Sequence, residues 1–213
     1  MHTLNMPLVL FYAPQSRSLA VRVLLEELKA DYQVHYLDLK KSDQLQTAYL
    51  AVNPYGKVPA VLHGDTLVSE QVALFIYLAD LFPAAGLAPA MDDPRRGAYL
   101  RWIAQYGSCF EPAIMDAFLK RETGPASTTP WRDLDTQLKV LSAQLEKTPY
   151  LLGEKISAAD ILWGIALHWL MAFKIVPELP VLRAYVESVW RLPGVVRVEQ
   201  ADAVWQASQA ANS

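Results

Sequence analysis

Residues 53–59 read Asn-Pro-Tyr-Gly-Lys-Val-Pro, and the apolar residues 60–62 follow them directly. Asparagine, proline and glycine are the residues that turns require, so this heptapeptide predicts a turn that leads into a strand at 59–63. Val58-Pro59 is a candidate cis peptide bond, since only X–Pro bonds adopt the cis form at a modest cost, roughly 0.5–1 kcal/mol. A trans loop proline is the alternative. A cis bond would direct the backbone of Val58 out of the sheet, where a peptide-like ligand could pair with it.

Upstream of this turn, strand and helix signals alternate. The apolar run 8–12 predicts a strand, and the alternating polarity of 34–39 predicts a second one. Between them, apolar residues recur at helical spacing and predict an amphipathic helix with Ser16 as its N-cap; these residues are Val21, Leu24, Leu25 and Leu28. A strand, a helix and a strand in this order predict a right-handed crossover with two parallel strands.

Downstream of the turn, residues 66–68 predict a further strand, which Gly64-Asp65 joins to the preceding one as a hairpin. Ser69 then opens a helix with an apolar face. With a short helix inside the polar stretch 40–52, the order is β-α-β-α-β-β-α. Residues 1–83 are therefore expected to form an α/β domain.

The composition changes after Phe82. Small residues and prolines fill 84–92, which we interpret as a linker, and every strong segment of 93–213 has helical periodicity. The expected helices are 93–121, 131–147, 157–172, 179–191 and 194–208. The sequence thus predicts an all-α domain after the α/β domain.

Charge, cysteine content and hydropathy exclude several classes of protein. The 213 residues include 19 Lys+Arg and 22 Asp+Glu, a net charge of -3, which argues against a nucleic-acid-binding protein. The single cysteine, Cys109, excludes an internal disulfide and a paired-cysteine redox site, and we expect an inert buried thiol. No signal peptide is recognisable, and the longest apolar run, 161–172, is shorter than the roughly 20 residues that span a membrane. We expect a soluble, cytoplasmic protein without a metal site or membrane contact.

Two predicted helix starts carry residues that could bind a ligand. Ser16, next to a second hydroxyl at Ser18, could donate to an anion and help to hold a thiolate. At the start of the later helix, free N–H groups attract a carboxylate, and the side chain of Glu70 could bind an ammonium group. Plain helix capping is the alternative interpretation at both positions.

The stretch Ser157-Ala158-Ala159-Asp160 has the spacing of a capping box before an almost wholly apolar helix. Because a buried helix end needs its N–H groups satisfied, we interpret Asp160 as structural rather than catalytic. His168 and the tryptophans of that helix are expected to lie in the core.

Over nearly its full length the chain resembles the cytosolic glutathione transferases. Residues 53–59 resemble the family's loop before its cis-proline, and 69–78 resemble its glutathione-carboxylate motif and helix. Residues 153–160 resemble its C-terminal folding motif. The resemblance implies a thioredoxin-like glutathione-binding domain at 1–83, a linker at 84–92 and an all-helical domain at 93–213.

The resemblance also implies roles for individual residues. The first turn is similar to that of the bacterial, serine-type classes, in which a serine two positions after the proline donates to the glutathione sulfur; here this is Ser16. Beta-class members carry a cysteine one position later, where this chain has Arg17, so mixed-disulfide chemistry is excluded at that position. The implied glutathione contacts are the Val58 backbone beside cis Pro59, Glu70 and Gln71 at the γ-glutamyl end, and Lys40, Lys41 or Lys57 at the glycyl carboxylate.

The pocket for the electrophile is implied to lie between the first strand–helix turn and the long helices after the linker. Its candidate residues precede Pro112, which should kink their helix; they are Tyr106, Cys109, Phe110 and Glu111. Ordinary interdomain packing is the alternative interpretation.

The implied activity is glutathione S-transferase, in which a glutathione thiolate attacks an electrophilic, apolar substrate in a cytoplasmic, detoxifying homodimer. One alternative is a glutathione-dependent isomerase or peroxidase that uses the same thiolate. Another is a binding or regulatory protein of the same fold that has no turnover.

Overall fold

The computed structural model describes residues 6–211, which form two compact units. The first unit contains the described residues up to Ala85 together with those from Arg191 onward, and the second is Gly86–Trp190. The C-terminal segment therefore groups with the α/β unit, whereas the sequence placed all of 93–213 in one helical domain. Among residues 6–211, no helix is both long and apolar enough to cross a bilayer.

The first unit is built on a four-stranded mixed sheet of order β2-β1-β3-β4. Its strands are β1 (Leu8–Tyr12), β2 (Tyr32–Tyr36), β3 (Ala60–His63) and β4 (Thr66–Ser69). β1 pairs in parallel with β2 and antiparallel with β3, and β3 pairs antiparallel with β4. The predicted parallel pairing of the first two strands and the hairpin at Gly64-Asp65 are confirmed.

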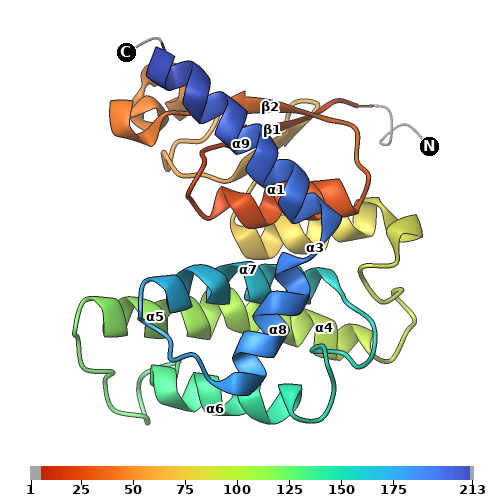
Figure 1. Cartoon of the computed structure of the whole chain (residues 1–213), viewed down its shortest axis with the longest axis vertical. Coiled ribbons are helices and arrows are strands. Elements are labelled where there is room, and N and C mark those ends of the chain that lie inside the picture. Colours follow the sequence, from red (N-terminus) through yellow and green to blue (C-terminus); the bar gives the residue numbers. More distant parts are fainter. Residues whose placement is uncertain (1–5, 212–213) are drawn as a thin grey trace. The chain divides into compact units, whose positions relative to one another are not determined.

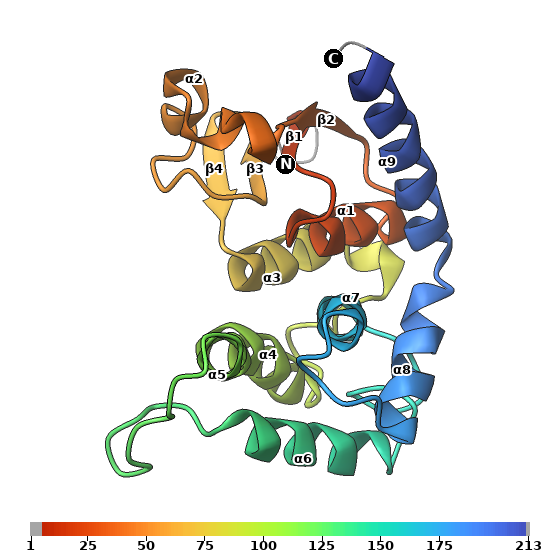
Figure 2. The same ribbon diagram turned by 60° about the vertical axis from the view of Figure 1, so that its left-hand side comes forward.

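Up to Ala85 the helices of this unit follow the predicted order, and the C-terminal helix joins them. They are α1 (Ser18–Glu27), the short α2 (Thr47–Leu50), α3 (Gln71–Leu81) and α9 (Pro193–Ala211), with short 3₁₀ turns at Leu39–Lys41, Asp43–Leu45 and Pro83–Ala85. Figures 1 and 2 show α1 and α3 together on one face of the sheet, and α9 alongside α1. On β1, Leu10 and Tyr12 are fully buried, while the alternate residue Phe11 packs with Leu37, Tyr49 and Ala60 in a separate cluster.

Three predicted boundaries in this unit are wrong. The second strand ends at Tyr36 rather than at residue 39, because the Asp38 carboxylate accepts the Lys40 N–H and caps a 3₁₀ turn. The first helix begins at Ser18 with Arg17 as N-cap, so Ser16 lies in the turn before it. Ser69 ends β4, and Glu70 is the N-cap of α3.

The first turn of helix α9 forms polar contacts with the end of α1. The backbone N–H of Gly194 donates to Glu27 Oε1 at 2.6 Å, and Arg197 Nε forms an ion pair with Glu26 Oε2 at 2.6 Å. A Cβ atom at residue 194 would lie 2.7 Å from Glu27 Oε1 and 3.1 Å from the Val23 carbonyl oxygen. Glycine therefore permits the close approach of the two helices.

The second unit is wholly helical. It contains α4 (Arg96–Gln105), a π-helical turn (Tyr106–Phe110), α5 (Glu111–Phe118), α6 (Leu134–Leu145), α7 (Ala158–Ala172) and α8 (Pro180–Trp190). The single helix expected over 93–121 is thus interrupted, and Pro112, which has no N–H to donate, stands in the first turn of α5. Trp102 and Trp163 meet edge to face in the core, 5.6 Å apart.

The predicted capping box at the start of α7 is confirmed. Asp160 is fully buried, and its carboxylate accepts the N–H groups of Ser157 and Leu151, both at 2.8 Å, and the hydroxyls of Ser157 and Tyr185. Burial raises the pKa of Asp160, although each of these hydrogen bonds acts in the opposite direction. The side chain joins the loop at Leu151, the start of α7 and helix α8.

Replacing Asp160 by alanine would leave several of these donors buried without an acceptor. We expect Asp160→Ala to lower the free energy of unfolding by about 2 kcal/mol or more, since each unsatisfied buried donor costs about 1–3 kcal/mol. Urea denaturation measures the loss. The folded fraction should keep the ligand affinity of the wild type; full stability together with lost ligand binding would contradict the structural role.

Candidate functional site

The strand register brings several candidate residues to one end of the sheet. Ala60 pairs with Phe11 on one side and with Ser69 on the other, and Tyr12 pairs with Tyr36. The chain segments that leave these positions therefore meet at the same sheet end: the β1–α1 turn, Val58-Pro59, Glu70 and the segment after β2. The sequence named these segments but contained no information about which of them are neighbours.

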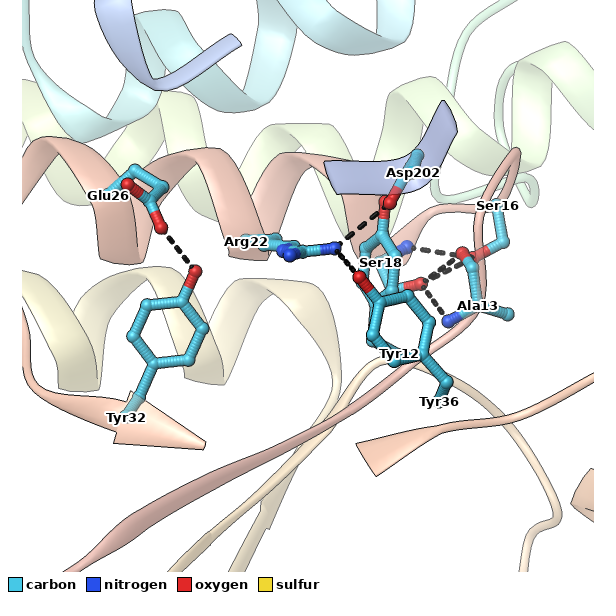
Figure 3. Close-up of polar contacts among 9 residues, drawn as sticks. All are labelled: Tyr12, Ala13, Ser16, Ser18, Arg22, Glu26, Tyr32, Tyr36 and Asp202. Atoms are coloured by element: carbon cyan, nitrogen blue, oxygen red, sulfur yellow. Dashed lines mark hydrogen bonds and ion pairs between the residues drawn. The ribbon is translucent and has the colours of Figure 1, made fainter. Parts of the chain in front are cut away.

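The β1–α1 turn holds a cluster of two hydroxyls. Ser18 Oγ is buried, accepts the N–H of Ala13 at 3.0 Å and lies 2.9 Å from the Ala13 carbonyl oxygen. Ser16 Oγ lies 2.8 Å from the same carbonyl oxygen and 2.5 Å from Ser18 Oγ (Figure 3). Ser16 is only partly buried, so of the two hydroxyls it is the one that a ligand can approach.

The start of α3 lies close to this turn. Gln71 Nε2 donates to the carbonyl oxygen of Arg17 at 3.1 Å and so links α3 to the turn before α1. Glu70 has φ +68° and ψ 125°, a backbone conformation that costs a non-glycine residue on the order of 1–3 kcal/mol. This strained residue is exposed and directly precedes the first N–H groups of α3, which have no acceptor within the helix.

The turn at 53–59 presents the backbone of Val58 at the same sheet end. The Val58-Pro59 bond is cis, as predicted, and Pro59 is buried. The Lys57 carbonyl oxygen accepts hydrogen bonds from the Tyr49 hydroxyl at 2.6 Å and from Asn53 Nδ2 at 2.9 Å. These two bonds stabilise the conformation of the turn.

The three candidate lysines are all exposed. Lys57 lies in the turn before Val58, and Lys40 lies in the 3₁₀ turn after β2. Lys41 Nζ lies 3.6 Å from Asp38 Oδ2 and 3.4 Å from Gln209 Oε1 of α9.

Behind the sheet end lies a polar network that the sequence did not reveal. Asp202 of α9 accepts the Tyr12 hydroxyl at 2.5 Å and pairs with Arg22 Nη1 at 2.9 Å, and the same nitrogen donates to the Tyr36 hydroxyl at 2.8 Å (Figure 3). Burial and the bond to Asp202 raise the pKa of Tyr12 far above its ordinary value, so this phenol stays a donor. Burial also raises the pKa of Asp202, against the effect of its two partners. No local pattern links positions 12, 22 and 202, because only the docking of α9 joins them.

The residues expected to form the electrophile pocket lie in the second unit. Tyr106 and Phe110 are buried in its core, with ring centroids 5.6 Å and 4.5 Å from that of Trp163. Glu111 accepts the Tyr106 hydroxyl at 3.0 Å. Cys109 is partly exposed, whereas the sequence predicted a buried thiol.

Two further expectations concern His168 and metals. His168 is only partly buried rather than a core residue, and its ring stacks on Trp190 with centroids 3.4 Å apart; burial lowers its pKa. Within residues 6–211, no cluster of His, Cys, Asp or Glu has the arrangement of a metal site.

A four-stranded sheet of this topology, with a cis X–Pro at the entrance of β3 and a separate helical unit, defines a glutathione-transferase fold. The chain belongs to the glutathione S-transferase family: residues 6–80 match the family's N-terminal domain and residues 129–193 its C-terminal domain. The predicted family and fold class, an α/β thioredoxin-like unit followed by an all-α unit, are confirmed.

Several known proteins are similar to this chain. Glutathione S-transferase GstA of Escherichia coli O157:H7 is 29% identical over 87% of this chain and 94% of that protein. A sphingomonad glutathione S-transferase, solved in complex with glutathione, is 30% identical over 92% of this chain and 98% of that one, with a TM-score of 0.73. The disulfide-bond oxidoreductase YfcG of Escherichia coli strain K12 is 29% identical over 71% of this chain and 75% of that protein.

The ion pair between Arg22 and Asp202 is the contact of α9 whose loss should be most costly, because both side chains are largely buried. We expect Asp202→Leu to lower the free energy of unfolding by about 3 kcal/mol, since it leaves a buried guanidinium without its partner. The double variant Arg22→Met, Asp202→Leu should recover much of this loss. As a matched control, Glu187→Gln breaks the exposed pair with Arg183 and should cost about 0.5 kcal/mol or less. Urea denaturation of the four proteins tests the assignment, and equal losses for Asp202→Leu and Glu187→Gln would contradict it.

Proposed function

We propose that this protein is a glutathione transferase of the serine type, acting as a cytoplasmic homodimer in the detoxification of electrophiles. The proposal rests on one observation: the hydroxyl of Ser16, the backbone of Val58 and the carboxylate of Glu70 stand on segments that share one end of the sheet. The family membership and the glutathione-bound relative support it.

In this proposal each end of glutathione has its own contact. The γ-glutamyl carboxylate lies at the first N–H groups of α3, including that of Gln71, and the ammonium group lies at the carboxylate of Glu70. The cysteinyl part pairs with the backbone of Val58, beside Pro59. The glycyl carboxylate lies near one of the exposed lysines, Lys40, Lys41 or Lys57.

Ser16 has the role of holding the thiolate. A free thiol has a pKa of about 8.5, and lowering this value by about two units corresponds to about 2.7 kcal/mol of stabilisation of the thiolate. If the Ser18 hydroxyl keeps its bond to the Ala13 carbonyl oxygen or turns to Ser16 Oγ, the Ser16 proton is free to point to sulfur. The thiol proton leaves to solvent, a sulfur lone pair forms the new S–C bond, and the leaving group departs with the electrons of its bond to carbon.

A second candidate function is glutathione-dependent redox chemistry, which one relative's name favours, since it is a disulfide-bond oxidoreductase. Arg17 and its neighbours in the β1–α1 turn offer no cysteine, so a disulfide between protein and substrate cannot form at that turn. Assays with an aryl halide and with a small disulfide, each with glutathione, separate the two functions.

Removing the Ser16 hydroxyl should affect turnover far more than glutathione affinity. With 1-chloro-2,4-dinitrobenzene as acceptor, Ser16→Ala should lower kcat by about 10²–10³, the effect of losing one preorganised donor to a developing anion. Ultraviolet absorbance of the bound thiolate should show that the thiol pKa rises toward its free value. Ser18→Ala is the paired variant and should lower kcat less. Full activity of Ser16→Ala together with loss of activity in Ser18→Ala would assign the role to the other hydroxyl.

The Glu70 carboxylate and the ligand ammonium should depend on each other. Glu70→Gln should weaken glutathione binding by about 1.5–3 kcal/mol, the range for a hydrogen bond to a charged group. Desamino-glutathione, which lacks only the ammonium, should bind the wild type weakly and be almost insensitive to this substitution. Calorimetric titration of both ligands against both proteins gives the coupling energy. Additive losses would place the γ-glutamyl end elsewhere.

A further inference from the structure

The side chain of Gln71 connects the start of α3 to the turn that carries Ser16. Its Nε2 atom donates to the carbonyl oxygen of Arg17 at 3.1 Å. Arg17 is the N-cap of α1, and its carbonyl group belongs to the peptide unit between residues 17 and 18. The bond therefore joins the starts of two helices that lie together on one face of the sheet (Figures 1 and 2).

The same peptide unit contacts the Ser16 hydroxyl. The backbone N–H of Ser18 donates to Ser16 Oγ at 3.2 Å (Figure 3). Gln71 thus binds the oxygen of a peptide group whose N–H points to the hydroxyl that is proposed to hold the thiolate. A hydrogen bond accepted by a peptide oxygen polarises the group and strengthens the bond that its N–H donates, by about 10–30%. A short chain of hydrogen bonds therefore runs from the amide of Gln71 to the oxygen of Ser16.

This chain of hydrogen bonds affects the direction of the Ser16 proton. When Ser16 Oγ accepts the Ser18 N–H, one of its lone pairs is directed to the backbone, and its single proton points elsewhere. The Ser18 hydroxyl lies 2.9 Å from the Ala13 carbonyl oxygen and can donate to it, so the Ser16 proton can turn to a sulfur atom. A donor that is fixed in this direction stabilises an anion more than a donor that must reorient.

The bonds within the β1–α1 turn fix its shape but not its position relative to α3. The N–H of Leu19 donates to the Ser16 carbonyl oxygen at 3.1 Å, and the hydroxyl bonds of both serines likewise stay within residues 13–19. Gln15 has a φ of +56°, a left-handed conformation that is unfavourable for a residue other than glycine. Gln71 belongs to α3, so its bond adds a restraint on this strained turn from outside it.

We infer that Gln71 is a positioning residue for the transferase reaction: through the peptide unit between residues 17 and 18, its side-chain amide orients the Ser16 hydroxyl toward the glutathione sulfur. This inference rests on the proposed function. It gives Gln71 two separate roles, because its backbone N–H is among those proposed for the γ-glutamyl carboxylate, whereas its side chain acts on the thiolate. Recognition of one end of glutathione and activation of its thiol are then coupled through one residue.

The test removes the amide of Gln71 without changing any charge. Gln71→Met keeps the length of the side chain, and the charged neighbours Arg17 and Glu70 stay the same. Ultraviolet absorbance of the bound thiolate, followed as a function of pH, should show a thiol pKa about 0.5–1 unit higher than in the wild type, as expected for the loss of one ordinary hydrogen bond. At a pH well below this pKa, the Kd of glutathione by calorimetry should stay within about twofold, because the bound thiol is protonated in both proteins.

The pH profile of turnover gives an independent readout. With 1-chloro-2,4-dinitrobenzene, kcat/KM of Gln71→Met should fall about three- to tenfold at a pH below the thiol pKa, in proportion to the lost thiolate. Above the thiol pKa of both proteins the difference should largely vanish. Gln33→Met is the matched control, since Gln33 is exposed on β2, and it should leave both the thiol pKa and the pH profile unchanged.

A double variant shows whether Gln71 acts through Ser16. Added to Ser16→Ala, Gln71→Met should raise the thiol pKa no further, because the hydroxyl that it orients is absent. An equal rise in both backgrounds would mean that Gln71 acts independently of Ser16. An unchanged thiol pKa in Gln71→Met would mean that the amide does not act on the thiolate, whether or not the Kd rises. Either result would overturn the inference and leave the proposed function intact, whereas absence of glutathione binding in the wild type would overturn the proposed function itself.

Discussion

The pairing of β3 between β1 and β4 is the constraint on which the candidate site depends. Because Ala60 lies opposite both Phe11 and Ser69, three chain segments that are distant in sequence leave the sheet at one place. A shift of one residue in this register would send the alternate side chains to the other face of the sheet. It would separate the hydroxyl turn from Glu70 and bury the wrong face of β1.

At this end of the sheet, neighbouring segments stabilise backbone and side-chain conformations that the local sequence would not favour. Glu70 has a positive φ without being glycine, and such strain persists where the neighbouring structure determines the backbone. The paired strand before it and the Gln71 link to Arg17 supply that determination. In the β1–α1 turn, two hydroxyls compete for the carbonyl oxygen of Ala13, so one hydroxyl proton can be released without leaving a buried acceptor unsatisfied.

Helix α9 contributes to the stability of the first unit along most of its length. Its beginning contacts α1 through Gly194, its middle places Asp202 against Arg22 and Tyr12, and its later part stacks Trp205 on Tyr36. Because successive turns of one helix make these three contacts, we expect substitutions in the Asp202 network to affect the packing of Trp205 on Tyr36 as well.

The sequence alone determined the local elements and the family. The apolar run 8–12, the turn 53–59 and the capping box 157–160 each depend on neighbouring residues, so the linear sequence is enough to predict them. The local pattern left both isomers of Val58-Pro59 open, and the resemblance to the family implied the cis form. The capping box also showed correctly that Asp160 stabilises the start of a buried helix. The predicted helix starts at Ser16 and Ser69 are wrong. A serine that precedes an apolar run can cap a helix, lie in a turn or end a strand, and the sequence looks the same in all three cases.

Only the tertiary structure determined which of these elements contact one another. Docking of α9 on α1 places Asp202 against Arg22, and Trp205 against Tyr36, across more than half the chain. No periodicity encodes such pairs, since they depend on the path of the whole chain and not on residues within a turn of one another. For the same reason the sequence could not show that the residues from Arg191 onward group with the α/β unit.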